Sequence, residues 1–176
     1  MSENKALNAV ASRVEGLELI IERVFDAPRE LVFSVFSDPV HLAAWWGPKG
    51  WETEVPELDF NEDGVWLYCM TCVDKNQGDF FGMKSCAKAV YHEIVVPEKI
   101  VYTDFFTDTE YNVLPEMPEM VITMEFIEEE GKTKIISRSK FSTAEAVKKV
   151  VDMGAVQGVS SQYERLDDYL SELQSK

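Results

Sequence analysis

Polar and apolar residues alternate with a period of two along most of the chain, which is typical of β-strands with one buried face. Trp66, Tyr68 and Met70, for example, share one face of the segment 65–73. Strands are expected at residues 17–25, 55–60, 65–73, 80–94, 100–106, 120–126 and 133–141. Short turns rich in Asn, Asp and Gly join several of them, so the sheet is expected to be largely antiparallel.

Helical segments flank these strands. Pro28 suits the first position of a short helix, and a second short helix ends near Trp45. The segment 155–173 has apolar residues at helical spacing and predicts one long amphipathic helix at the C-terminal end. Gly154 and Gly158 either let this helical region approach a neighbour closely or break it at Gly154.

The order of these elements predicts the fold class. A strand, two short helices, a run of strands and a long terminal helix indicate an α+β helix-grip fold, in which a curved antiparallel sheet of about six or seven strands wraps around the C-terminal helix. A chain of 176 residues most simply forms one domain. Residues 1–15 are small and polar and are expected to form a flexible tail, which leaves 16–176 as the domain.

The charge of the chain narrows the list of partners. Its 32 acidic and 17 basic residues give a formal net charge of -15, which repels nucleic-acid phosphates and anionic lipids. No apolar stretch is long enough to insert into a membrane, and the N-terminus lacks the features of a secretory signal. The three cysteines have no disulfide-framework spacing and suit a reducing compartment. We therefore expect a cytoplasmic protein with no nucleic-acid partner.

The sequence offers little metal or nucleophile chemistry. Cys69 and Cys72 match the spacing C-x-x-C, but residues three apart in a strand point to opposite faces, so the two sulfurs cannot share a metal ion. Cys86, His41 and His92 complete no recognisable ligand spacing, and neither histidine lies in a nucleophile motif. No metal and no cofactor are expected.

Several segments resemble a known family. They are Arg23–Pro28, Trp45–Pro48, Pro97–Thr103 and Gly131–Thr133. In this order the chain is similar, from about residue 17 to 173, to the SRPBCC or START-like superfamily, and within it to the family named for activators of the heat-shock protein 90 ATPase. The resemblance implies a helix-grip fold with a central cavity, but no single activity. The chain departs from the family pattern at Ala89, where glycine is common, and at Asp104, where an aromatic residue is common.

Strand parity and the resemblance together predict a ligand site. The expected lining residues are Trp66, Tyr68, Met70, Tyr102, Asp104, Ile122, Met124, Ser137 and Ser139. This set is mostly apolar with a few polar groups, as ligand cavities are, although the same residues could form a filled core. Trp45, Trp46 and Trp51 either form a lip at the mouth of the cavity or close one end of the core.

Asp104 is the candidate for a catalytic residue. Facing inward, its carboxyl group would have a raised pKa and would act as a base or bind a polar ligand group. Facing outward, it would be an ordinary solvated side chain. The outward or rim position is preferred, since an unpaired inward carboxylate is costly and a shift of one residue reverses the face.

These features predict non-catalytic binding of a lipophilic small molecule between the sheet and the C-terminal helix. One alternative is a co-chaperone-like interaction module, with a chaperone or a second copy of the chain as its partner. The other is a cyclase- or hydrolase-type enzyme that uses Asp104 or a tyrosine in the same cavity.

Overall fold

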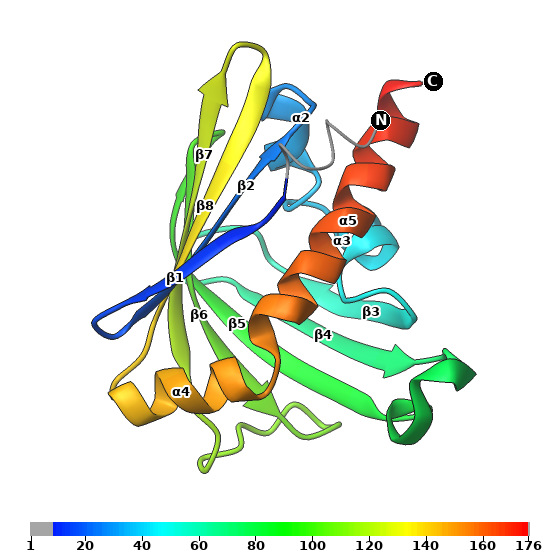
Figure 1. Cartoon of the computed structure of the whole chain (residues 1–176), viewed down its shortest axis with the longest axis vertical. Helices are drawn as coiled ribbons and strands as arrows, with labels where there is room; N and C mark the ends of the chain where they lie inside the picture. Colours follow the sequence, from blue (N-terminus) through cyan, green and yellow to red (C-terminus); the bar gives the residue numbers. More distant parts are fainter. Residues whose placement is uncertain (1–8, 176) are drawn as a thin grey trace.

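Within the described part of the chain, eight strands form one open antiparallel sheet in the order β1-β2-β8-β7-β6-β5-β4-β3 (Figure 1). The computed structural model describes residues 9–175. The strands are β1 (Ala11–Glu15), β2 (Glu18–Phe25), β3 (Trp51–Leu58), β4 (Val65–Cys72), β5 (Lys84–Val95), β6 (Lys99–Thr107), β7 (Met120–Glu129) and β8 (Lys132–Lys140). The α+β helix-grip class is thereby confirmed, with eight strands in place of the expected six or seven.

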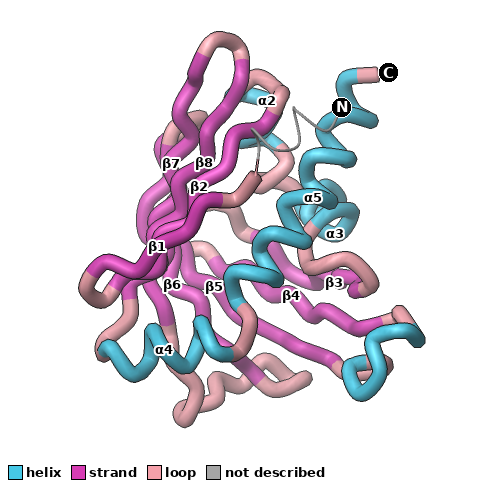
Figure 2. The backbone as a smooth tube through the Cα atoms, in the orientation of Figure 1, coloured by secondary structure: helices cyan, strands magenta, loops and turns pink. Residues whose placement is uncertain are grey.

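Helix α5 (Ala155–Gln174) passes over the concave face of this sheet, with α2 (Arg29–Ser34) and α3 (Pro39–Trp45) on the same side (Figure 2). Helix α4 (Ala144–Asp152) precedes α5, and a short 3-10 helix η1 (Lys75–Phe80) lies between β4 and β5. The long helix α5 crosses the concave face diagonally, and α4 lies beside the lower end of the strands in this view. The expected long C-terminal helix and the two short helices near the N-terminus are confirmed.

The extra strand lies in the segment that was expected to be a tail. Residues 11–15 form β1, which pairs with β2 from Ala11 opposite Glu22 to Glu15 opposite Glu18. All five side chains of β1 are exposed, so the sequence shows no alternation of apolar residues that would predict this strand. The tail prediction was therefore wrong for residues 11–15, while residues 1–8 lie outside the described residues.

The connection between β4 and β5 also differs from the expectation. The strand expected from residue 80 begins at Lys84, because η1 occupies residues 75–80. Gly78 and Gly82 have φ angles of 61° and 86°, in the left-handed region that glycine tolerates. With these two residues in left-handed conformations, the segment is not extended, and the strand begins only at Lys84.

The C-terminal helical region is broken at Gly154. This residue has a φ angle of 89° and lies between α4 and α5. The break lets the chain turn, so that α4 and α5 follow different directions (Figure 1). Of the two interpretations of Gly154, the helix break is the one found in the structure.

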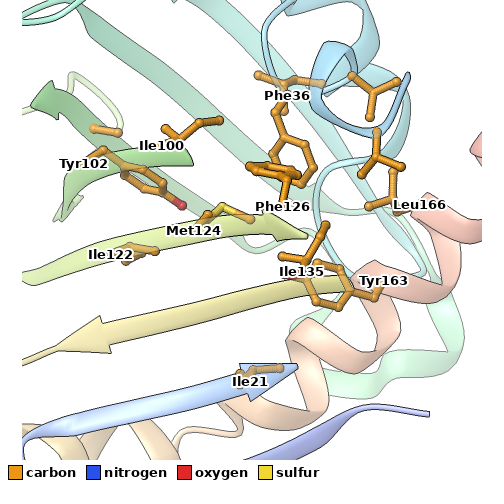
Figure 3. Close-up of a cluster of buried hydrophobic side chains, with 14 of the residues drawn as sticks. Ile21, Phe36, Ile100, Tyr102, Ile122, Met124, Phe126, Ile135, Tyr163 and Leu166 are labelled. Atoms are coloured by element: carbon orange, nitrogen blue, oxygen red, sulfur yellow. The ribbon is translucent and has the colours of Figure 1, made fainter. Parts of the chain in front are cut away.

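Most of the large buried side chains gather at one end of the concave face. Figure 3 shows Phe36, Phe126 and Leu166 packed together, with Tyr163 close by. The rings of Phe36 and Phe126 meet edge to face at 5.3 Å between centroids, and Phe25 meets Tyr163 in the same way at 5.2 Å. Such aromatic contacts fill this end of the domain with closely packed side chains.

Cys69 and Cys86 form a disulfide between β4 and β5. The strand register places them directly opposite each other on the face of the sheet that points away from α5. Cys72 lies on the other face and is a buried free thiol. The opposite orientation of Cys69 and Cys72 is confirmed, but the sequence interpretation missed the partner of Cys69. With this disulfide the cysteines no longer support a reducing compartment, and the cytoplasmic location stays a prediction.

Candidate ligand cavity

A cavity of about 300 Å³ lies between the concave face of the sheet and the helices α4 and α5. Its wall contains many more apolar than polar groups and comes from β2, β4, β6, β7, β8 and the junction between α4 and α5. Of the predicted lining residues, the wall includes Trp46, Tyr68, Met70, Tyr102, Asp104, Ile122, Met124, Ser137 and Ser139. Those of them that lie in strands all point to the concave face, as the alternation along each strand predicted.

Two alanines in β5 explain why the sheet leaves space here. Ala87 lies opposite Tyr68 of β4, and Ala89 lies opposite Asp104 of β6. Their methyl groups fill little volume between the two neighbouring strands. The phenol of Tyr68 therefore extends over β5 and donates a hydrogen bond to Asp104, with an oxygen–oxygen distance of 3.2 Å.

Helix α5 contributes small residues where it passes over the cavity. Ala155, Gly158 and Val159 line the cavity, whereas Leu166 and Leu170 fill the packed end. A Cβ atom added to Gly158 would have no heavy atom within 4 Å. The expectation that Gly158 permits close helix packing was therefore wrong: its missing side chain leaves space beside the helix.

Asp104 faces the cavity, which corrects the preference for an outward or rim position. It is half-buried, and its exposed part opens onto the cavity. Burial raises the pKa of its carboxyl group from 3.8 to about 7, and the hydrogen bond from Tyr68 opposes part of that rise. Burial, together with the nearby carboxylate, also raises the pKa of the phenols of Tyr68 and Tyr102, which keeps them neutral.

A carboxyl group with a pKa near 7 exists in both protonation states at neutral pH. Asp104 can therefore accept a proton, donate one, or hold a negative charge next to a bound molecule. The enzymatic alternative stays a prediction, and a pH–rate profile on candidate substrates would test it.

The tryptophans occupy different places. Trp46 lines the cavity, and its ring lies 5.6 Å from that of Tyr68. Trp45 is fully buried, packs against Phe36 and donates its indole N–H to the carbonyl of Val35 at 3.0 Å. Trp45 therefore closes the packed end of the core, and the lip interpretation stays a prediction for Trp46.

Trp51 and Trp66 lie outside the cavity wall. Trp51 begins β3 and donates its indole N–H to Gln77 at 3.1 Å, at the edge of the sheet. Trp66 lies behind the wall, where its ring contacts those of Trp46 and Tyr68 at 4.8 and 4.6 Å. The proposal that Trp66 shares one continuous lining with Tyr68, Tyr102 and Met124 is corrected accordingly, because the neighbouring rings cover it.

Arg165 of α5 holds the loop that carries Trp46, a role the sequence interpretation missed. Its guanidinium group lies 2.9–3.3 Å from five backbone carbonyl oxygens, those of Ala44, Trp46, Gly47, Pro48 and Trp51. Gln162 also accepts a hydrogen bond from the backbone N–H of Gly47 at 2.9 Å. The available signal was a single arginine in an otherwise acidic helix.

A second and more open hollow of about 550 Å³ lies outside the predicted site. It is bounded by the loop that follows β6 and by the start of α4, and its wall includes Glu116, Glu145 and Lys149. This wall exposes more polar than apolar surface, unlike that of the inner cavity. Apolar ligands gain more from the inner cavity, since burial of apolar surface supplies most of their affinity.

The remaining candidates for chemistry are engaged in local contacts. His41 shares a hydrogen bond with the hydroxyl of Tyr169 at 2.6 Å, and His92 shares one with Thr103 at 2.5 Å. Within residues 9–175, no three His, Cys, Asp or Glu side chains are grouped so as to hold a metal ion. The absence of a metal from the protein stays a prediction. None of the helices described is both long and apolar enough to cross a membrane.

Comparison with known proteins decides the family. The family model described as "Activator of Hsp90 ATPase homolog 1-like protein" matches residues 26–171. The chain belongs to this family. Activator of Hsp90 ATPase homolog 1-like domains have the helix-grip fold found here, which is that of a ligand-binding or interaction domain.

Solved structures of similar proteins agree. Protein Ms6760 from Mycobacterium smegmatis is 27% identical with a TM-score of 0.81, and the match covers 92% of this chain and 94% of that one. A protein from Arthrobacter aurescens is 28% identical, with a TM-score of 0.83 and coverage of 94% and 92%. One from Staphylococcus epidermidis is 26% identical, with a TM-score of 0.78 and coverage of 92% and 94%. No curated protein matches the sequence.

Proposed function

We propose that the protein binds a lipophilic small molecule in the inner cavity without transforming it. The observation that carries the proposal is the mainly apolar cavity of about 300 Å³ beneath α5. This volume is at the lower end of the range for small-molecule sites, which begins at about 300 Å³. A ligand with two or three rings would bury most of its surface there.

Two properties of the wall support this proposal: most of it consists of packed strands, and it carries a few polar side chains. Closely packed strands supply most of its apolar residues, so little ordering is needed when a ligand enters. Ser137 and Ser139 add hydroxyl groups on β8, and Asp104 adds a carboxyl group on β6. A few polar groups in an apolar wall fix the orientation of a ligand.

A neutral fluorescent lipophile tests the proposal directly. N-phenyl-1-naphthylamine should gain fluorescence on binding, quench the tryptophan emission through Trp46, and raise the melting temperature of the protein. A panel of uncharged lipophiles should then displace it. No fluorescence gain and no thermal shift across the panel would refute the proposal.

Two variants of α5 separate cavity binding from surface adsorption. Gly158→Phe should place a ring in the open space beside the helix and abolish probe binding. Gln157→Phe places the same ring at the exposed neighbouring position and should leave probe binding unchanged. Equal binding by both variants would place the probe elsewhere on the protein.

An interaction with another protein is the second candidate. The tip between β4 and β5 exposes Val73, Phe80, Phe81 and Met83, each between 43% and 56% exposed. Grouped exposed apolar side chains often mark an interaction surface. The family description suggests the chaperone Hsp90 as the partner to test. Stimulation of its ATPase by the wild type, lost in a Phe80→Ser, Phe81→Ser variant, would support this role, and no stimulation would exclude it.

A further inference from the structure

We infer that the cavity selects lipophilic molecules that carry a cationic ammonium group, which Asp104 binds beside the aromatic rings of Trp46 and Tyr68. This inference rests on the proposed function, because it specifies the chemical class of the ligand for the same cavity. It follows from the charge, the hydrogen bonding and the ring geometry of the wall.

The only charge that a residue of the described wall can carry is negative. Among the described residues that line the cavity, Asp104 is the only Asp, Glu, Lys, Arg or His. A ligand carboxylate or phosphate would therefore meet a negative group with no cation to offset the repulsion. A ligand cation would meet its counter-charge in an apolar setting, where the attraction is stronger than in water.

Asp104 keeps acceptor capacity for such a ligand. A carboxylate has two oxygens with about four acceptor positions. The hydroxyl of Tyr68 lies 3.2 Å from one oxygen and 3.5 Å from the other, and it can donate only one proton. The remaining acceptor positions are open to a donor that enters the cavity. An ammonium group that carries N–H bonds is such a donor, and its hydrogen bonds to a carboxylate are charge-assisted. A fully methylated ammonium group has no N–H, and the carboxylate attracts it through charge alone.

The rings beside Asp104 add a second feature suited to a cation. Trp46 and Tyr68 meet at 73° with their centroids 5.6 Å apart, and Tyr102 contributes a third ring to the wall. The faces of aromatic rings carry partial negative charge and attract cations within about 6 Å. Several rings around a carboxylate form a setting that recognises ammonium groups, including fully methylated ones.

The pH dependence follows from the groups that face Asp104. These are Tyr68 from β4, Tyr91 from β5 and Tyr102 from its own strand, while β7 contributes the uncharged Met120 opposite it. The tyrosines stay neutral at physiological pH because burial raises the pKa of each phenol. Ionisation of Asp104, whose pKa is about 7, is therefore the change that controls cation binding between weakly acidic and weakly basic pH.

A permanent cation and its neutral isostere test this inference. Trimethyl(2-phenylethyl)ammonium and 3,3-dimethylbutylbenzene differ only by a nitrogen or a carbon at one atom, so their shapes match and the ligand charge does not change with pH. Each would displace N-phenyl-1-naphthylamine from the wild type, from Asp104→Asn and from Glu57→Gln. The last variant removes one exposed carboxylate and controls for the general attraction of a chain with net charge -15 for cations.

At about pH 8 the cation should bind about tenfold more tightly than the isostere to the wild type and to Glu57→Gln. That preference should largely disappear in Asp104→Asn and at about pH 5. Equal binding of the two ligands at the higher pH would overturn the inference and leave the proposed function intact. A preference that persists in Asp104→Asn would also overturn it. Failure of both ligands to displace the probe would overturn it too, and binding of the probe itself reports on the proposed function separately.

Discussion

Asp104 illustrates how the surroundings of one residue decide its chemistry. Two positions with alanine on β5 let the phenol of Tyr68 reach its carboxyl group, and the apolar wall raises its pKa to about 7. A residue that reads as an ordinary acidic position in a strand thus becomes the one charged group of the described cavity wall.

The raised pKa of Asp104 predicts a pH-dependent stability difference. The unfolded chain loses this proton near pH 3.8 and the folded chain near 7, so between these values the folded state binds more protons. The free energy of unfolding therefore falls as pH rises from about 4 to about 7. Asp104→Asn should be more stable than the wild type at about pH 8, by on the order of 4 kcal/mol, and equally stable at about pH 4.

Urea denaturation at several pH values would measure this difference. Glu57→Gln is the control, because it removes one exposed carboxylate of the chain and leaves Asp104 in place. A stability difference between Asp104→Asn and the wild type that stays constant over the whole pH range would contradict the assigned titration.

Arg165 makes a second residue-level prediction. Arg165→Lys keeps the charge, but one ammonium group cannot reach the five carbonyl oxygens that the guanidinium group contacts. We expect a loss of about 1–3 kcal/mol in the free energy of unfolding and weaker probe binding, since the loop with Trp46 loses its anchor. Lys148→Ala removes only an exposed ion pair, which solvent and salt screen, and should change the stability much less than Arg165→Lys. Similar effects from the two variants would contradict the anchoring role.

Helix α5 divides the concave face into two zones. Small residues near its N-terminal end leave the cavity, which extends along the helix as far as Tyr163, whereas Leu166 and Leu170 fill the packed end. The same helix thus closes the hydrophobic core and bounds the ligand space. Its amphipathic pattern predicted the first role, and the family resemblance predicted the second.

The two glycines at the start of α5 should respond to alanine in opposite ways. Gly158→Ala should raise the free energy of unfolding by about 0.5–1 kcal/mol, because Gly158 is helical and its Cβ would meet no atom. Gly154→Ala should lower it by about 1 kcal/mol, because Gly154 has a φ angle of 89°. Thermal and urea unfolding of both variants would measure these changes. Equal effects would show that the helix break is not fixed at Gly154.

The pairing of β4 with β5 predicts the state of the cysteines. Because Cys69 and Cys86 lie directly opposite each other and are bonded, the unreduced protein in denaturant should show one reactive thiol, that of Cys72. Reduction before the assay should raise the count to three. Three thiols without reductant, in protein purified under oxidising conditions, would show that the disulfide does not form.

The net charge of -15 acts on the molecule as a whole. Like charges repel more strongly in the compact state, and salt screens this repulsion as the Debye length falls from about 30 Å at 0.01 M to about 8 Å at 0.15 M. The melting temperature should therefore rise with sodium chloride over this range, as calorimetry can measure. A fall would mean that the surface ion pairs outweigh the repulsion.

Local patterns were enough to predict most of the architecture. Alternation located seven of the eight strands approximately, helical spacing located α5, and short turns indicated the antiparallel order. These features depend on periodicity within one segment, which the sequence displays directly. The same parity placed Tyr68, Tyr102 and Met124 correctly on the concave face.

The tertiary structure decided several features that the alternation of residues within a strand does not reveal. Edge strand β1 has no buried face to leave a pattern, and Trp66 shares the parity of the wall but is covered by other rings. The disulfide partner of Cys69 depends on the register between two strands, and the contacts of Arg165 join segments more than 100 residues apart. The alternation along a strand predicts which face of the sheet a side chain occupies. Whether that side chain contacts a cavity, a ring or a helix depends on the segments that pack against this face.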